Sequence, residues 1–256
     1  MVTPAGDFVE SERPPVALRA AHLDSLQQGQ SLWLEQRVRT GRSWSLPDCV
    51  YVVVEDCEIV EFHASPHLDP IDTFTRALEA CGARSMVCTS FDAPAISVAS
   101  ARATTTDEVG ILFHTYRATQ PVWPDGFTIR DGLVADVDIV AGLDDGFFDG
   151  PDEIAGFQQR GGLVIGEFGG DLVGCALSTV VIDGRPGIDV GMWVSPAWRG
   201  RGFGPVLVGA AAARAEASGG IPIAGCDVAN IASIRSLMRV GFVADHRLIR
   251  FVFDGD

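Results

Sequence analysis

The sequence predicts a mixed α+β fold in two lobes, with a mostly antiparallel sheet flanked by helices, and three observations support this prediction. With 256 residues, 47% of them hydrophobic, the chain can bury one large core or two smaller ones. Helix-like and strand-like segments follow each other irregularly, which favours α+β over repeated strand–helix–strand units. The stretch QPVWPDG at residues 120–126 has two prolines and a glycine, as an interdomain connection would. We therefore expect domains at residues 1–121 and 122–256.

In the first half, the apolar spacing of residues 16–40 predicts helix, with a break at residues 28–30. The later helix, at DPIDTFTRALEACG, can be capped by Asp69 or Asp72 and ends at Gly82. The other expected elements are strands at residues 49–54, 57–62, 85–91 and 108–116 and a short helix at 93–103.

The second half predicts a longer series of elements, in which three strands form an antiparallel meander. Two turns, at residues 169–171 and 183–187, join these strands. The expected elements are strands at residues 127–130, 162–168, 172–182, 188–194, 222–228 and 246–253 and helices at 133–147, 151–159, 204–218 and 231–240.

Two stretches of the first half resemble stretches of the second. ACGARSMVCTSF (80–91) lines up with ASGGIPIAGCDV (217–228), and VEDCEIVEF (54–62) lines up with EFGGDLVGC (167–175) at a different separation. We interpret the first half as a reduced copy of the second that has lost one strand and a glycine-rich loop. The alternative is a chance resemblance between two α+β halves.

The charge of the chain restricts its partners. A net charge of -15 and a pI near 4.6 argue against duplex nucleic acid or an anionic membrane as the main partner. All 19 basic residues are arginine, and the absence of lysine excludes a Walker A loop and a Schiff-base enzyme built on its own lysine. The N-terminal residues hold no apolar segment typical of a signal peptide, and no apolar run is long enough to span a membrane, so we expect a cytoplasmic protein.

The cysteines and histidines predict no metal site. None of the six cysteines forms a C-x-x-C pair, so we expect free thiols. His63 and His67 are separated by Pro66, which favours a surface loop over a metal-binding pair. A covalent route through Cys226 is an alternative that no neighbouring histidine supports.

The stretch VSPAWRGRGFGP (194–205) concentrates arginine and glycine in an acidic chain. Its arginines supply guanidinium donors, and its glycines leave the backbone open, so that successive N–H groups can converge on an anion at the start of the next helix. Pro205 fits the first helical turn, where its missing N–H has no helical partner. The dinucleotide pattern G-x-G-x-x-G fails because Pro205 stands at the third glycine position. The alternative is a glycine-rich surface turn with solvated arginines.

Together with a second motif, this loop resembles the GNAT superfamily of acyl-CoA-dependent N-acyltransferases. The family signature [RQ]-x-x-G-x-[GA] is met by Arg199, Gly202 and Gly204, and the preceding V-x-P-x-x-R begins at Val194. The second block, N-x-x-S-x-x-x-L-x-x-x-G-F, consists of Asn230, Ser233, Leu237, Gly241 and Phe242. The resemblance covers residues 127–253, and the first half would be a degenerate GNAT-like lobe without the loop.

The resemblance implies acetyl-CoA or another acyl-CoA as cofactor, with its diphosphate held by the loop. The strand before the loop would diverge at a bulge near residues 191–194, so that a backbone N–H can polarise the thioester carbonyl. Asn230 would also cap its helix. The residues that the resemblance assigns to cofactor binding are Met192, Trp193, Val194, Arg199, Gly200, Arg201, Gly202, Phe203, Gly204, Asn230 and Ser233.

Catalysis then requires a base for the amine and an acid for the leaving thiolate. Alternation along IDVGMWV puts Asp189 on the face opposite Ile188 and Val190, which makes it the first candidate base, with Glu167 second. Either residue can instead be an ordinary solvated carboxylate. Many GNAT members use a tyrosine as the acid at the position of Leu237, so that acid is missing here. Thiolate is a tolerable leaving group near neutral pH.

The resemblance therefore implies an N-acyltransferase, in the first place an N-acetyltransferase, that acts on a primary amine of a small molecule by direct attack. The alternatives are a non-catalytic acyl-CoA-binding sensor and a protein N-terminal acetyltransferase. The negative charge favours a cationic acceptor. We expect a monomer with pseudo-dimeric lobes or a homodimer, with neither nucleic acid nor a membrane as partner.

Overall fold

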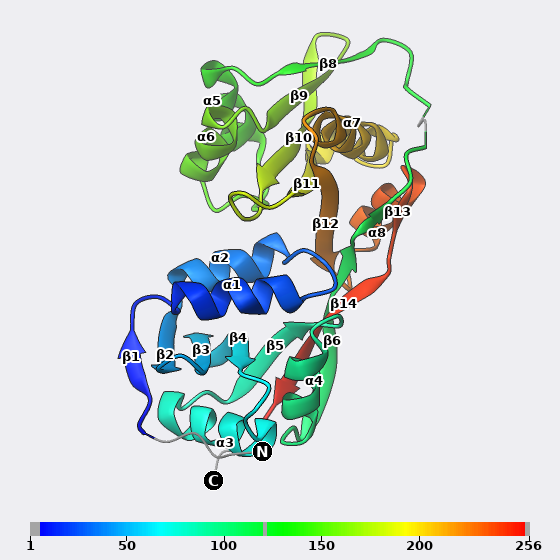
Figure 1. The fold of residues 1–256 in the computed structure, drawn as a ribbon. Helices are drawn as coiled ribbons and strands as arrows, with labels where there is room; N and C mark the ends of the chain where they lie inside the picture. Colours follow the sequence, from blue (N-terminus) through cyan, green and yellow to red (C-terminus); the bar gives the residue numbers. More distant parts are fainter. Residues whose placement is uncertain (1–5, 120–121, 254–256) are drawn as a thin grey trace. The chain divides into compact units, whose positions relative to one another are not determined.

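The computed structural model describes residues 6–119 and 122–253 and has the predicted α+β class, with mostly antiparallel sheets flanked by helices (Figure 1). The chain divides into two compact units. The first consists of Met1–Ile111 and His246–Asp256, and the second of Leu112–Asp245.

The expected interdomain connection falls partly on Gln120 and Pro121, which lie outside the described residues. The domain boundary drawn there therefore stays a prediction. Among the described residues, no helix combines the length and the apolar character that crossing a membrane requires.

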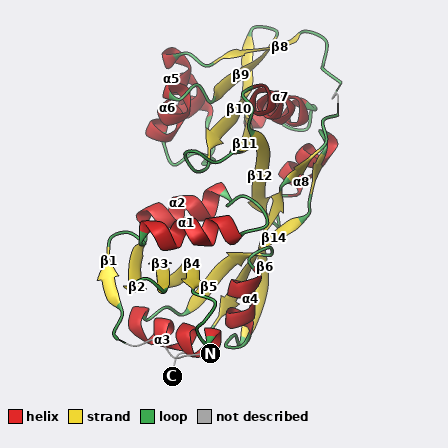
Figure 2. Ribbon diagram, viewed as in Figure 1, coloured by secondary structure: helices red, strands yellow, loops and turns green. Residues whose placement is uncertain are grey.

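The first unit is a mixed sheet with a pair of helices on each face (Figure 2). Helices α1 and α2 pack on β3 and β4, whereas α3 and α4 cover the opposite face, where Phe74 and Val98 are fully buried in the core. The sheet order is β1-β2-β3-β4-β5-β14-β6. Its elements are β1 (Val9–Ser11), α1 (Val16–Ser25), α2 (Leu32–Thr40), β2 (Arg42–Leu46), β3 (Val50–Glu55), β4 (Glu58–Ala64), α3 (Pro70–Cys81), β5 (Ser85–Thr89), α4 (Ala93–Ser100), β6 (Thr105–Phe113) and β14 (His246–Val252).

Helix α3 begins and ends as its sequence predicts. The Asp69 carboxylate accepts hydrogen bonds from the backbone N–H groups of Ile71 and Asp72, at 3.1 and 3.0 Å. Gly82 ends the helix in the left-handed conformation, with φ of 66°. The start of α3 is therefore already occupied by a negative group of the chain itself.

The second unit has the sheet order β12-β11-β10-β9-β8. Helices α5 and α6 cover one face, where Ile154 and Trp193 are buried, and α7 packs against β10 and β11. Its elements are β7 (Thr115–Tyr116), β8 (Phe127–Asp131), α5 (Val134–Leu143), α6 (Pro151–Gln159), β9 (Leu163–Phe168), β10 (Asp171–Val180), β11 (Gly187–Val194), the 3-10 helix η1 (Pro196–Trp198), α7 (Phe203–Ala217), β12 (Ile221–Asp227), α8 (Ile231–Arg239) and β13 (Phe242–Val243).

Helix α5 ends four residues earlier than expected. The carboxylate of Asp144 accepts hydrogen bonds from the backbone N–H groups of Gly146, Phe147 and Phe148, at 3.1 to 3.3 Å. These bonds stabilise a turn, so the chain between α5 and α6 is a loop.

The two units repeat one order of elements: strand, two helices, three strands, helix, strand, helix. In both units the strand before the long central helix pairs in parallel with the strand after it, β4 with β5 and β11 with β12. The hairpin at residues 54–62 therefore corresponds to β10 and β11, and its alignment with residues 167–175 was wrong by one strand. The first unit has lost no strand, so it is not reduced in its elements. The two units differ in the connection that precedes the central helix.

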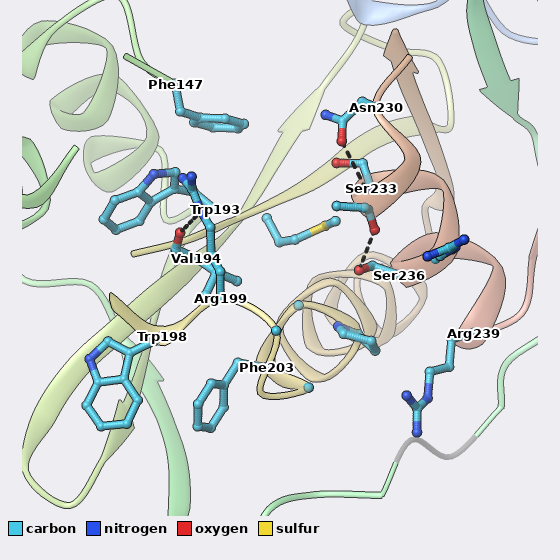
Figure 3. A pocket seen from close by; sticks show the side chains of 17 residues that line it. Phe147, Trp193, Val194, Trp198, Arg199, Phe203, Asn230, Ser233, Ser236 and Arg239 are labelled. Atoms are coloured by element: carbon cyan, nitrogen blue, oxygen red, sulfur yellow. Dashed lines mark hydrogen bonds between the residues drawn. The ribbon is translucent and has the colours of Figure 1, made fainter. Parts of the chain in front are cut away.

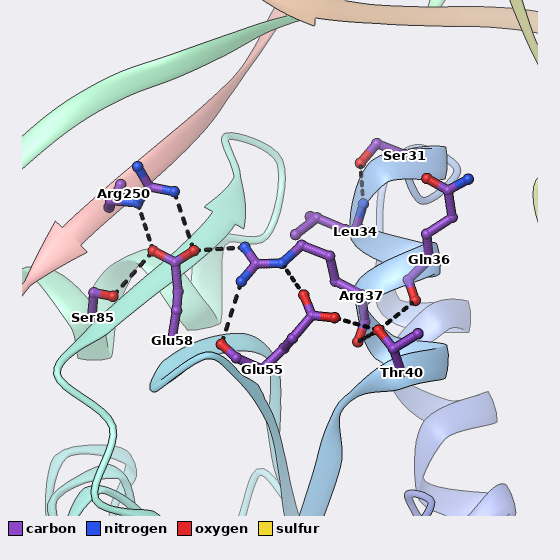
Figure 4. Close-up of polar contacts among 9 residues, drawn as sticks. All are labelled: Ser31, Leu34, Gln36, Arg37, Thr40, Glu55, Glu58, Ser85 and Arg250. Atoms are coloured by element: carbon purple, nitrogen blue, oxygen red, sulfur yellow. Dashed lines mark hydrogen bonds and ion pairs between the residues drawn. The ribbon is translucent and has the colours of Figure 1, made fainter. Parts of the chain in front are cut away.

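The last strand of the chain completes the first unit. β14 pairs antiparallel with β5, from Leu248 opposite Thr89 to Val252 opposite Ser85. Ion pairs with Glu58 also hold β14 in this position (Figure 4). Arg250 of β14 and Arg37 of α2 both donate hydrogen bonds to the buried carboxylate of Glu58, with shortest contacts of 2.6 Å. Burial alone would raise the pKa of Glu58, but these hydrogen bonds hold it below its usual value.

Candidate functional site

The site begins where two parallel strands separate. β11 and β12 pair only from Gly187 to Asp189, opposite Ile221 to Ile223. Beyond this point the backbone of residues 190–194 has no strand partner on the β12 side among the residues that the structure describes. The pairing of β11 with β10 continues without a shift to Val194, so the bulge expected near residues 191–194 is absent from this register. The open strand edge comes from the separation of the two strands alone.

The arginine-glycine loop leads directly into α7. Gly200 and Gly202 have φ of 76° and 88°, a left-handed backbone that favours glycine. Gly202 is the N-cap of α7, and no side chain caps this helix. The N–H groups of its first turn therefore remain available to an anion, as the sequence predicts.

A pocket of about 520 Å³ lies between the loop, the end of β11 and α8 (Figure 3). It contains ten of the eleven residues expected to bind a cofactor, namely Met192, Trp193, Val194, Arg199, Gly200, Gly202, Phe203, Gly204, Asn230 and Ser233. Arg201 does not line it, because its guanidinium stacks on Trp198 at 4.8 Å from the ring centre.

Arg199 lines the pocket but is held by a carboxylate. Its two terminal nitrogens donate to Asp145, each at 2.7 Å, and its Nε donates to the carbonyl of Val194 at 3.0 Å. The indole N–H of Trp193 also donates to Asp145, at 3.3 Å. Hydrogen bonds from Arg199 and Trp193 lower the pKa of Asp145. Arg199 therefore stabilises the loop through Asp145, a partner that no sequence pattern indicates.

Helix α8 closes the other side of the pocket. The Asn230 side chain accepts the N–H of Ser233 at 3.1 Å, which confirms its place as N-cap. Gly204 permits close approach of the two helices, because a Cβ atom there would lie 3.0 Å from the Ser236 hydroxyl. Leu237, at the position of the missing tyrosine, is only 3% exposed. Two arginines of α8 line the pocket as well, Arg235 and Arg239, although neither belongs to the predicted motifs.

The two candidate bases lie far apart. Asp189 stands opposite Thr179 on β10, whereas Glu167 stands opposite Leu172, and the strand between these positions is about 23 Å long. Glu167 forms an ion pair with Arg130 at 2.8 Å. Asp189 is half-buried at the point where β11 and β12 separate, three residues before Met192. Burial raises the pKa of Asp189 to about 7.

The other reactive groups contribute little to the site. Burial, with the neighbouring Asp227 charge, raises the pKa of Cys226 to about 11, so its thiol stays protonated at neutral pH. All six cysteines are free. Among the described residues, no group of three or more histidine, cysteine and acidic side chains could hold a metal ion.

Separated parallel strands beside an uncapped helix start offer backbone hydrogen-bonding groups to an extended, anionic ligand. Comparison with known proteins relates this site to a family. Residues 139–242 match the sequence model described as "Acetyltransferase (GNAT) family". This match covers the arginine-glycine loop, the pocket and α8, so the region is similar to GNAT acetyltransferase domains, whose cofactor is an acyl-CoA. The uncapped start of α7 and the pocket beside it fit such a group. No curated protein matches the chain significantly.

Solved structures extend the likeness to the whole chain. A GNAT-family acetyltransferase from Colwellia psychrerythraea has a TM-score of 0.83 at 16% identity, over 97% of this chain and 99% of the other. A tandem GNAT protein from the clavulanic acid biosynthesis pathway has a TM-score of 0.63 at 13% identity, over 98% and 99%. At such identities the likeness concerns the fold, and the first unit shares that GNAT-like fold.

Proposed function

We propose that the protein transfers an acyl group, in the simplest case acetyl, from acyl-CoA to a primary amine of a small molecule by direct attack. The observation that carries this proposal is the pocket between separated strands, with an uncapped helix start at its edge. The bound cofactor would supply the activated thioester. A cationic acceptor suits the net charge of -15.

The chain's own groups have distinct tasks in this proposal. The N–H groups at the start of α7, together with the loop from Gly200 to Gly202, hold the diphosphate. The free strand edge of residues 190–194 pairs with the pantetheine arm, and one of its N–H groups polarises the thioester carbonyl. Asn230 and Ser233 line the opposite wall.

Asp189 is the base that we propose for the amine. A carboxylate with a pKa of about 7 is half ionised at neutral pH and can accept a proton directly or through a water. Its distance along β11 from Met192, about 10 Å, leaves room for the acceptor between the base and the thioester. Glu167 is the weaker candidate, because Arg130 already neutralises it.

The leaving thiolate has no tyrosine acid. Because Leu237 is buried, we propose that water protonates the thiolate, which its pKa near 8.5 permits. The same observation favours a second candidate function, a non-catalytic acyl-CoA sensor. Turnover of an amine by a protein that binds acetyl-CoA would exclude the sensor, and screening small amines against peptide N-termini would identify the acceptor class.

We propose that only the second unit binds acyl-CoA. In the first unit, the Asp69 carboxylate already occupies the start of α3, where it would repel a phosphate. The repeated element order supports a monomer, which light scattering coupled to size-exclusion chromatography would test. The six free thiols support a cytoplasmic location.

The decisive experiment places a negative charge at the start of α7. Gly202→Asp introduces a carboxylate at the N-cap, and Gly202→Ala is the matched control, because both side chains meet the strain of a φ of 88°. Isothermal titration should show micromolar binding of acetyl-CoA and no binding of NAD by the wild type. Gly202→Asp should bind acetyl-CoA at least about tenfold more weakly than Gly202→Ala. Equal binding by the two variants would contradict a diphosphate at this helix start.

A further inference from the structure

Arg235 and Arg239 form a cationic pair in the pocket that the proposed chemistry does not use. They lie four residues apart on α8, hence on one face of the helix, and both line the pocket. Figure 3 shows the Arg239 side chain extending away from the helix. Both residues are exposed, and neither guanidinium has a hydrogen-bond or ion-pair partner within the part of the chain that the structure describes.

The arginine pair differs from three other arginines of the same unit. In the same unit Arg130, Arg199 and Arg214 each hold a carboxylate, as expected at a net charge of -15. Two like charges one turn apart repel each other. The helix dipole favours Arg239 in the last turn, but it does not explain Arg235, one turn earlier. An anion between the two side chains would remove the repulsion.

The position of the pair limits what that anion can be. Ser236, next to Arg235 in the sequence, faces Gly204 in the first turn of α7, so the arginines project beside the proposed diphosphate site. The diphosphate itself can be met by the N–H groups of α7. The third guanidinium of the pocket, that of Arg199, is held by Asp145. The pair is therefore left for another anionic group of the same ligand.

We propose that Arg235 and Arg239 bind the 3′-phosphate of acyl-CoA and so select it over the 3′-dephospho form. This inference rests on the proposed function of the pocket. A phosphate monoester carries nearly two negative charges at neutral pH and offers three acceptor oxygens, which two planar guanidinium groups can match. The diphosphate site then contributes most of the binding affinity, and the arginine pair recognises the phosphate on the ribose of the ligand.

The test compares CoA with 3′-dephospho-CoA by isothermal titration. The wild type should bind CoA about ten- to a hundredfold more tightly, as two charge-assisted contacts predict. The double variant Arg235→Gln, Arg239→Gln should lose this preference to within about twofold. Its affinity for 3′-dephospho-CoA should stay at the wild-type value, which also demonstrates that the variant folds. Arg117→Gln is the matched control, because Arg117 is an exposed arginine of the same unit that does not line the pocket.

The other outcomes separate this inference from the proposed function. If the wild type binds both ligands equally, or if the double variant keeps the wild-type preference, the arginine pair does not bind the 3′-phosphate. The pocket would still bind CoA in either case, so the proposed function would stand. If the wild type binds neither ligand, the proposed function and this inference both fail. A preference that Arg117→Gln also loses would indicate a general effect of charge and overturn the assignment.

Discussion

Replacing Asp189 with asparagine separates a catalytic role from a structural one, because the two roles respond to pH in opposite ways. Burial raises the pKa of Asp189 to about 7, whereas an unperturbed aspartate has a pKa of about 3.9. A base acts in its ionised form, which makes up about a tenth of the molecules at pH 6 and about nine-tenths at pH 8. The kcat/KM of the wild type should therefore rise through pH 7 and level off above it.

The same shift in pKa predicts an effect on stability with the opposite sign. Between about pH 4 and pH 7 the folded protein holds this proton more tightly than the unfolded chain, so the free energy of unfolding falls as the pH rises. A shift of about three units has a ceiling of about 4 kcal/mol. Because Asp189 is only half-buried, we expect about 1–2 kcal/mol. Asparagine cannot ionise, so Asp189→Asn should exceed the wild type in stability by this amount at pH 8.

The assay measures both quantities on one set of variants. At pH 8, Asp189→Asn should lower kcat/KM by about 10²- to 10⁴-fold and should lose the rise through pH 7, while urea unfolding should detect its gain in stability. Asp183→Asn, in the exposed turn before β11, is the control that should change neither quantity. An Asp189→Asn variant with the wild-type rate and pH midpoint would refute the assignment of this residue as the base.

Three further predictions follow from single contacts. Arg199→Lys should weaken acetyl-CoA binding about tenfold, as much as Arg199→Ala, because lysine cannot reproduce the two parallel hydrogen bonds to Asp145; titration in which lysine restores affinity would show that Arg199 acts on the ligand by its charge. Asp69→Ala should cost about 0.5–2 kcal/mol of unfolding free energy through the lost cap of α3, measured by urea unfolding, and acetyl-CoA affinity should stay constant. Cys226→Ser should keep wild-type activity, because the raised pKa of Cys226 keeps its thiol protonated. A variant that folds but is inactive would support the covalent route through Cys226.

The features that the sequence predicted well are those carried by short stretches of chain. The loop, the start of α7 and the N-cap Asn230 depend on glycine conformation and on hydrogen bonds between residues three or fewer apart, so local residue types are sufficient. Asp69 as the cap of α3 was predictable for the same reason.

Contacts between distant residues were not predictable in this way. Nothing near Arg199 in the sequence indicates that Asp145 would hold it, since the two meet only when the loop after α5 folds beside β11. Strand β2 was missed because RSWSL holds only two apolar residues, too few to distinguish a strand from a loop, although β3 pairs with its full length. Arg235 and Arg239 have the spacing of any solvated helix face, and only the pocket distinguishes them.

The position of β14 affects the order in which the protein can fold during synthesis. The strand that lies between β5 and β6 leaves the ribosome only after every element of the second unit. Until then the nascent first unit exposes the unpaired backbone of β5, an edge that can associate with other chains. Closing it joins residues as far apart as Met86 and Phe251, a slow step for a domain of this size. Chaperone dependence should therefore be concentrated in the half of the chain that is made first.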